Sequence, residues 1–284
     1  MKKQKNSSAW MALPLYIFTI VFVICPLLYV VALSFATSNR GYGVTWKFTL
    51  DNYKNILEPV YLNTFVESLK LALTSTAAIV LIGYPFGYFM AKLPEHRKKK
   101  AHLLLTLPFW VNSLIRLYGW IIILQKKGLL NFVLMKLGLI KKPLAILYSY
   151  PAIVVGMIYV LLPFMIMSVY SSAEKLDWSY VEAARDLGAS RVQAFFTVTL
   201  KLTLPGLLSG VILTFVPSMG LFFIADILGG NKIVLVGSLI QDQMTRGSNW
   251  PFAAALAVVM MVLTTVMIMI YRKVSNAREL EGIG

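Results

Sequence analysis

Residues 182–188 read Glu-Ala-Ala-Arg-Asp-Leu-Gly and lie in a polar segment of a chain that otherwise consists of long apolar runs. Upstream of Gly188, apolar side chains recur at helical spacing from about Asp177 to Leu187, which predicts an amphipathic helix. Gly188 follows where such a helix should end, because glycine adopts a left-handed backbone without a steric penalty. The polar segment 171–201 is therefore predicted to present short, well-capped helices to water.

A second short helix is predicted to begin at Ser190. Gln193 stands three residues after Ser190, the spacing of a capping box, in which two side chains satisfy the first free backbone N–H groups of a helix. At the first helix, Ser179 and Glu182 have this same spacing, and Asp177 is an equally good cap. Each helix carries an apolar stripe, which is typical of a docking surface. The stripes comprise Leu176, Tyr180, Ala183, Ala184 and Leu187, then Val192, Phe195, Phe196 and Leu200.

The composition indicates a polytopic membrane protein. Of the 284 residues, 58% are hydrophobic and only 14% are charged, whereas soluble domains are about half apolar and about a quarter charged. The net charge of +15 lies in short basic clusters beside apolar runs, where lysine and arginine orient membrane proteins and do not indicate nucleic-acid binding. Cys25 is the only cysteine, which excludes a disulfide framework, and we expect no metal site.

Six apolar runs are long enough to cross a membrane as helices, which takes about 20 residues each. They cover about 11–35, 67–91, 101–124, 146–170, 202–224 and 252–271. The first is too long for a signal-peptide core and lacks a convincing cleavage site, so we expect it to be retained. The predicted fold class is an all-α membrane protein with six transmembrane helices. The whole chain, residues 1–284, is predicted to form a single transmembrane domain.

The orientation follows from the distribution of lysine and arginine, which favour the inner side. With the N-terminus inside, the inner segments carry more of these residues than the outer ones, which predicts both termini inside and 171–201 on the cytoplasmic side. The segment 125–145 opposes this assignment, because its lysines would lie outside. Its middle, Leu129 to Leu139, is apolar enough to lie as an interfacial helix on the outer surface. The lysines are Lys126, Lys127, Lys136, Lys141 and Lys142.

Helix-breaking residues interrupt most of the spans. Proline removes a backbone donor and bends a helix, and a membrane tolerates the bend where neighbouring helices or a water-filled cavity satisfy the freed groups. The pattern is compatible with ordinary kinks in a packed bundle and with a bundle that opens and closes. The residues are Pro26, Gly83, Pro85, Pro108, Pro163 and Pro217.

The chain contains none of the sequence patterns of a phosphate-binding loop, a zinc protease or a serine hydrolase. The spans also lack paired carboxylates and a Ser/His pair, so an enzyme is not indicated. A few polar groups remain at membrane depth, where each needs a partner or water. Among them, Arg116 lies inside the third span, and we expect a structural pairing for it.

Three carboxylates are candidates for a cation path. Asp226 follows the fifth span, just past Phe222, and is either a loop or capping residue at headgroup level or a carboxylate beside aromatic faces that attract an ammonium. Glu67 opens the second span, and Asp242 lies in the last outer loop. Trp110 is first of all an interfacial or packing aromatic, and it completes the set of candidate path residues.

The run Glu182-Ala183-Ala184-x-x-x-Gly188 resembles the cytoplasmic coupling loop of ABC importer permeases. In that family the pattern continues with nine residues, Ile, one residue and Leu-Pro; here Val198 replaces the isoleucine and Lys201 stands at the proline. Further blocks, from about residue 50 to about residue 254, resemble the B-type permease of spermidine/putrescine importers, in the binding-protein-dependent transport permease family. They are Asp51-Asn52-Tyr53, Gly83-Tyr84-Pro85, Leu107-Pro108-Phe109-Trp110, Asn112-Ser113-Leu114-Ile115-Arg116, Leu161-Leu162-Pro163-Phe164 and Met219-Gly220-Leu221-Phe222.

The resemblance implies the fold of a type I ABC importer permease and a half-channel for polyamines in the bacterial inner membrane. The implied partners are a second related permease, two ATPase subunits and a periplasmic or lipid-anchored polyamine-binding protein, with membrane lipid around the spans. The chain itself would bind no cofactor, and ATP and magnesium would belong to the ATPase. The implied ATPase-coupling residues are Glu182, Ala183, Ala184, Asp186 and Gly188.

Two other functions remain open at this stage. An importer for an anion such as sulfate or a phosphonate, or for iron, would share this architecture, and the outer lysines favour the anion. A secondary transporter or channel would need no ATPase, which the capped loop argues against. The net charge of +15 also fits a cationic substrate poorly, so the partner permease would have to supply carboxylates.

Overall fold

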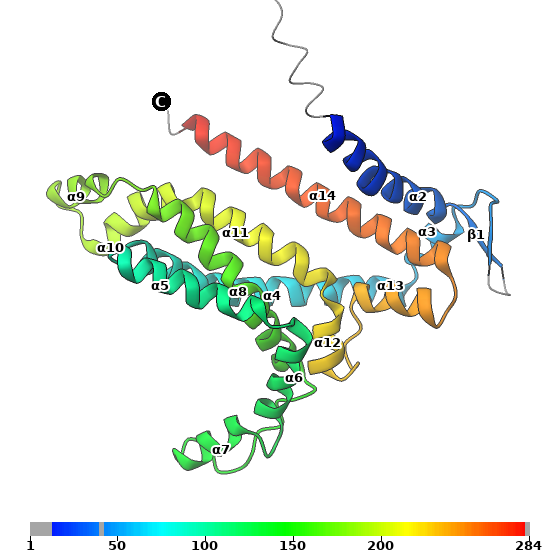
Figure 1. Cartoon of the computed structure of the whole chain (residues 1–284), viewed down its shortest axis with the longest axis horizontal. Coiled ribbons are helices and arrows are strands. Elements are labelled where there is room, and N and C mark those ends of the chain that lie inside the picture. Colours follow the sequence, from blue (N-terminus) through cyan, green and yellow to red (C-terminus); the bar gives the residue numbers. More distant parts are fainter. Residues whose placement is uncertain (1–12, 40–42, 282–284) are drawn as a thin grey trace, which may run out of the picture. The chain divides into compact units, whose positions relative to one another are not determined.

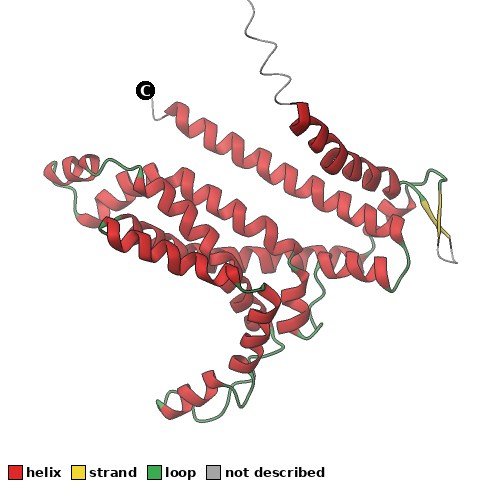
Figure 2. Ribbon diagram, in the orientation of Figure 1, coloured by secondary structure: helices red, strands yellow, loops and turns green. Residues whose placement is uncertain are grey.

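The computed structural model describes residues 13–39 and 43–281, most of them in helices, with two short strands and several loops between them (Figures 1 and 2). Six helical segments are long and apolar enough to cross a membrane, as the sequence predicts, and the chain is a multi-pass membrane protein. They are Leu13–Ser34, Pro59–Ala91, Ser113–Lys136, Tyr150–Glu174, Arg191–Gly220 and Trp250–Tyr271. The inside location of both termini stays a prediction.

The chain divides into two compact units. The first holds the described residues up to Asn63 together with Leu239–Val266, and the second holds Thr64–Ser238 and the described residues from Met267 onward. Whether the chain acts as a single domain stays a prediction.

Elements at the start of the chain belong to the first unit. They are the π-helix η1 (Ile20–Ile24), α2 (Cys25–Ser34), the antiparallel strands β1 (Thr37–Asn39) and β2 (Gly43–Thr45), and α3 (Asp51–Ile56). Asn52 holds them together, because its amide donates to the carbonyls of Ser34 and Ala36, both at 2.9 Å. These bonds satisfy carbonyl groups that the end of α2 would otherwise leave free.

Helices of the second unit carry the candidate site. They are most of α4 (Pro59–Ala91), α5 (Glu95–Thr106), the 3-10 helix η2 (Leu107–Trp110), α6 (Ser113–Leu124), α7 (Leu129–Lys136), α8 (Tyr150–Glu174), α9 (Ser179–Asp186), α10 (Arg191–Ala194), the π-helix η3 (Phe195–Thr199), α11 (Leu200–Gly220) and α12 (Phe222–Gly229). Two further helices, α13 (Val236–Thr245) and α14 (Trp250–Glu281), each contribute residues to both units.

Close packing around α8 forms the centre of the second unit, where α8 and α11 run side by side (Figure 1). A Cβ added at Gly206 of α11 would lie 2.4 Å from Cβ of Ser172, and one added at Gly87 of α4 would lie 2.7 Å from the carbonyl oxygen of Ile166. Small residues let membrane helices approach this closely. Ser168 then donates a 2.8 Å hydrogen bond to the carbonyl oxygen of Gly206.

The prediction of one continuous helix over 101–124 is wrong. α5 ends at Thr106, η2 follows, and Val111 and Asn112 are extended, with ψ values of 137° and 133°. Pro108 lacks the N–H that a continuing helix would use, and the Asn112 side chain accepts a 2.8 Å hydrogen bond from the Leu114 N–H. Asn112 therefore starts a new helix, α6, as an N-cap.

The fifth span and the segment after it also differ from the prediction. The fifth span is longer than expected, because α10, η3 and α11 form one helical segment from Arg191 to Gly220. Leu221, with φ −78° and ψ 57°, separates it from α12. Asp226 lies within α12, so of the two alternatives for this carboxylate, the loop position is wrong.

Candidate functional site

The α9–Gly188–α10 pair is built from hydrogen bonds between residues close in sequence. Trp178 is the N-cap residue of α9 and makes no side-chain cap bond, but Oδ1 of Asp177, one residue earlier, accepts a 3.0 Å hydrogen bond from the N–H of Ser179, the first residue of the helix. That bond stabilises the charged carboxylate and lowers the pKa of Asp177 below its ordinary value. Ser190 and Gln193 form the predicted capping box at α10, with N···O distances of 3.2 and 2.8 Å.

Gly188 ends α9 with the predicted left-handed backbone, at φ +92°. The Gly188 N–H donates to the carbonyl of Arg185 at 2.9 Å, and the Ala189 N–H donates to the carbonyl of Ala184 at 3.0 Å. These two bonds constitute a Schellman motif, which satisfies the last carbonyls of the helix. Open space surrounds the position where a Cβ would stand on Gly188, so the backbone conformation alone requires glycine.

The apolar stripes of this pair lie largely in the open. Leu187 is 90% exposed, and Tyr180, Val192 and Phe196 are exposed at 59–65%. Among the predicted coupling residues, Glu182, Ala183, Asp186 and Gly188 are exposed and Ala184 is half-buried. Large apolar side chains on exposed helices are typical of a docking surface.

Phe195 departs from the predicted stripe, because it turns inward. Its ring lies 5.9 Å from that of Tyr84 and 5.7 Å from that of Tyr88, both edge to face. The second stripe therefore divides into the exposed Val192 and Phe196 and the inward-facing Phe195.

A cluster of Tyr88, Lys92 and Trp178 ties the pair to α4. The ammonium of Lys92 lies 4.3 Å from the ring centre of Tyr88 and 4.7 Å from that of Trp178. Tyr88 also contacts Trp178 edge to face at 5.8 Å. Trp178 and Phe195 flank the pair on its two sides, so α4 contacts both of its ends. Sequence reasoning missed this cluster, because Lys92 lies just past the end of α4 and Trp178 is 86 positions further along the chain.

A second link joins α5 to the end of α8. Lys98 donates to Glu174 at 3.1 Å, and the Tyr170 hydroxyl donates to the same carboxylate. Glu174 of this second link and Trp178 of the first both lie within the five residues that precede α9. The pair is therefore attached through several polar and aromatic contacts and not through a single hinge.

Lys201 keeps the helix after the pair continuous. The family pattern has a proline at this position, whereas lysine retains its backbone N–H. The chain forms π-helix η3 over Phe195–Thr199 and then continues as α11. Such π-bulges occur frequently at functional sites.

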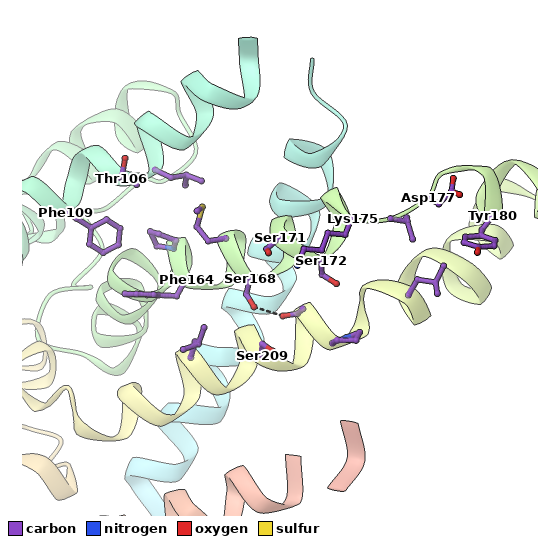
Figure 3. A pocket seen from close by; sticks show the side chains of 18 residues that line it. Thr106, Phe109, Phe164, Ser168, Ser171, Ser172, Lys175, Asp177, Tyr180 and Ser209 are labelled. Carbon is purple, nitrogen blue, oxygen red and sulfur yellow. Dashed lines mark hydrogen bonds between the residues drawn. The ribbon is translucent and has the colours of Figure 1, made fainter. Parts of the chain in front are cut away.

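A groove of about 840 Å³ runs along α8 between α5 and α11 (Figure 3). Phe109 and Phe164 lie at one end, and Lys175, Asp177 and Tyr180 lie at the end next to α9 (Figure 3). Hydroxyl groups line the stretch between them, and apolar side chains form the remaining wall. The hydroxyls are those of Thr106, Ser168, Ser171, Ser172 and Ser209, and the apolar residues include Pro163, Met167 and Leu213.

The predicted path carboxylates each have a partner close in the chain. Glu67 pairs with Lys70 at 2.7 Å, and Asp242 pairs with Arg246 at 3.5 Å. Asp226 Oδ1 accepts a 3.1 Å hydrogen bond from the Ser238 hydroxyl.

The two predicted path aromatics occupy different surroundings. Phe222 lies beside Phe223 in α12, and Trp110 is 77% exposed in η2, adjacent to Phe109. In the described part of the chain, the residues that line the groove include neither these aromatics nor the three carboxylates. Their place in a substrate path stays a prediction.

Arg116 has aromatic neighbours in place of the expected ionic partner. Its guanidinium carbon lies 5.8 Å from the ring centre of Phe109 and 5.3 Å from that of Tyr159. Its Nε is buried without a hydrogen-bond partner. Among the salt bridges between described side chains, none includes Arg116.

Comparison with known proteins places these features in a family. The family described as binding-protein-dependent transport system inner membrane component matches residues 6–279. The chain is 43% identical over 257 residues to the spermidine/putrescine transport system permease protein PotB of Escherichia coli K12, covering 90% of this chain and 94% of that protein. The protein of the same name from Haemophilus influenzae is 41% identical, covering 90% of each chain.

A solved structure shares the fold at low sequence identity. A chain of the bacterial alginate ABC transporter, solved in complex with a periplasmic protein that holds an alginate pentasaccharide, superposes with a TM-score of 0.71 at 16% identity. The match covers 95% of this chain and 93% of that chain. The fold of an ABC importer permease, implied by the resemblance, is confirmed.

Proposed function

This chain belongs to the family of binding-protein-dependent transport system inner membrane components, and from that premise we propose that it is a permease subunit of an ATP-driven importer of polyamines. The observation that carries the proposal is the exposed, locally capped α9–Gly188–α10 pair, at the position between spans where such a permease meets its ATPase. The names of its relatives, which cover nearly the whole chain, support spermidine or putrescine as the substrate.

The proposed partners follow from the same premise. Two ATPase subunits would bind α9 and α10, a second related permease would complete the channel, and a polyamine-binding protein would deliver the substrate. The location would be the bacterial inner membrane, with α9 and α10 on the cytoplasmic side. ATP and magnesium would be held by the ATPase.

The pair has the properties that a mechanical connection needs. Ala183 adds little bulk, so a partner surface can approach the helix closely, while Glu182 offers a carboxylate to a base. Lys92 and Tyr88 hold Trp178 at one end of the pair, and Tyr84 and Tyr88 of α4 hold Phe195 at the other. Closure of the ATPase dimer would therefore move the pair and the attached spans together, which switches access from outside to inside.

The test is uptake by the reconstituted complex. This chain is co-expressed with a candidate second permease, ATPase and binding protein from the same genome, purified in detergent and placed in liposomes. We expect radiolabelled spermidine to enter with ATP and not with a non-hydrolysable ATP analogue, and unlabelled putrescine to compete. The matched control omits the binding protein.

Two outcomes contradict the proposal in different ways. Uptake driven by a proton gradient without ATP indicates a secondary transporter. ATP-driven uptake of sulfate or molybdate without uptake of spermidine indicates an anion importer.

Asp226 is the proposed carboxylate of the path. The variant Asp226→Asn removes its charge and keeps its shape, and we expect slower spermidine uptake at saturating binding protein. The matched control is Asp51→Asn, which removes a carboxylate that pairs with Lys54 and is not among the predicted path residues. An unchanged affinity and rate in Asp226→Asn removes this residue from the path.

A further inference from the structure

We propose that Phe109 and Tyr159 form an aromatic slot for an ammonium group of the transported cation, and that Arg116 occupies this slot while substrate is absent. The inference rests on the proposed import of polyamines and assigns a subsite to it. The aromatic slot means Phe109 of η2, Arg116 of α6 and Tyr159 of α8, so three separate elements build it.

The geometry of the slot is that of a cation between two aromatic faces. The guanidinium carbon of Arg116 is 5.8 Å from the ring centre of Phe109 and 5.3 Å from that of Tyr159. Both distances lie within the range of cation–π attraction. Neighbouring rings hold the two faces in place, because Phe164 packs against Phe109 at 5.6 Å and Trp120 packs against Tyr159 at 5.5 Å.

The bonding of Arg116 makes it displaceable. A buried arginine paired with a carboxylate is strongly held, because removing either partner leaves an uncompensated charge. Arg116 instead has a buried Nε without a hydrogen-bond partner, none of the salt bridges between described side chains includes it, and its guanidinium lies over two ring faces. A second cation can replace it on those faces by the same attraction.

One wall of the slot, Phe109, also lines the groove. Phe109 is 44% exposed and lines the groove beside Phe164, and Tyr159 is half-buried. The helix break at Val111–Asn112 lies between Phe109 and Arg116 in the chain. Arg116 therefore belongs to α6, whereas the Phe109 ring that it contacts belongs to η2. A change in the backbone angles of Val111 or Asn112 would therefore move Arg116 away from the Phe109 ring.

The groove itself fits a linear polyamine. Hydroxyl oxygens of Ser171, Ser172 and Ser209 can accept hydrogen bonds from ammonium groups, while Pro163 and Met167 can contact the methylene segments. With one ammonium in the aromatic slot, the rest of such a molecule can extend along the groove toward α9.

The experiment uses the complete reconstituted complex at saturating spermidine-loaded binding protein. We expect Phe109→Leu and Tyr159→Leu, which remove a ring and keep an apolar side chain, to lower the spermidine moved per ATP about tenfold, since a cation–π contact is lost. Tyr159→Phe restores the ring and should recover uptake relative to Tyr159→Leu. The matched control is Phe132→Leu on α7, which removes a ring that faces Lys136 at 6.0 Å outside the slot.

Arg116→Gln tests occupancy directly. Tetramethylammonium binds to aromatic faces without hydrogen bonds, so it should inhibit Arg116→Gln at about tenfold lower concentration than wild type, because the tethered competitor is gone. Adding Tyr159→Leu should abolish this sensitivity. A merely structural arginine would lower complex yield and leave the sensitivity to tetramethylammonium unchanged.

The outcomes separate the slot from the proposed function. No spermidine uptake by the wild-type complex contradicts polyamine import itself. The slot alone is overturned if the wild-type complex takes up spermidine and the uptake per ATP is the same in Phe109→Leu, Tyr159→Leu and the control Phe132→Leu. Unchanged tetramethylammonium inhibition in Arg116→Gln overturns the occupancy of the slot by Arg116.

Discussion

Two helix breaks in the second unit have opposite designs. At Gly188, residues 187–190 join α9 to α10 around one left-handed residue, and the stabilising hydrogen bonds on both sides come from residues within five positions. At Val111–Asn112, two extended residues join η2 to α6 beside the half-buried Arg116. The first break is exposed to solvent, and the second adjoins the aromatic slot and the groove.

The difference shows what each break can do. Backbone groups freed in water bind water, so the exposed break needs only its local caps and presents side chains outward. Backbone groups freed within a membrane need protein or a water-filled cavity, so the second break depends on its surroundings. We therefore expect changes at Gly188 to affect coupling and changes near Asn112 to affect stability and substrate handling.

The largest effect is expected for Gly188→Val. A β-branched residue resists the φ of +92°, at a cost of about 1–3 kcal/mol, so α9 and α10 should lose their relative orientation. We expect ATP hydrolysis to continue while spermidine uptake per ATP falls roughly tenfold. The matched control is Gly138→Val, which has φ +73°, equally open surroundings and a position outside the pair. Normal uptake in Gly188→Val contradicts the coupling role.

The next largest effect is expected for Trp178→Ala, which removes the ring that contacts both Lys92 and Tyr88. The pair then loses a contact to α4, and we expect uptake per ATP to fall about threefold to tenfold, as for one lost cation–π and ring contact. Trp178→Phe should recover part of the loss. The control is Trp46→Ala in the first unit, where the indole is 63% exposed. Equal coupling in both alanine variants shows that this cluster does not transmit motion.

Asn112→Ala should have a moderate effect on stability. It removes the N-cap of α6, which contributes about 1 kcal/mol, and thermal unfolding of the purified complex should shift to lower temperature. Asn112→Ser retains an acceptor and should restore most of the shift. Asn55→Ala, at an exposed position of α3, serves as control. A wild-type unfolding temperature in Asn112→Ala means that packing alone maintains the break.

The smallest effect is expected at Asp177. Its pKa is lowered by the hydrogen bond from the Ser179 N–H, so its contribution is present above the ordinary aspartate pKa of about 3.9 and is lost as pH falls through the lower, folded value. In Asp177→Asn, the first amide hydrogens of α9 should exchange with solvent faster than in wild type at neutral pH. That difference should shrink once the carboxyl is protonated, and a constant difference across this range contradicts a role for the charge.

Sequence-based prediction was most accurate where the responsible contacts are local. Ser190 and Gln193 bind each other across three residues, and the apolar runs that mark the spans are continuous. It failed where hydropathy is averaged over a window, because such an average does not register the extended residues 111–112 or the helical position of Asp226.

The amino-acid sequence by itself determined six membrane spans and a glycine-broken helix pair, because chain length, apolar runs and capping side chains act over short distances. Only the tertiary structure decided which side chains meet across helices. It placed Trp178 and Lys92 together, and it put Arg116 between Phe109 and Tyr159. Those contacts join residues up to 86 positions apart in the chain, and they depend on how α4, α6 and α8 pack, which no local pattern encodes.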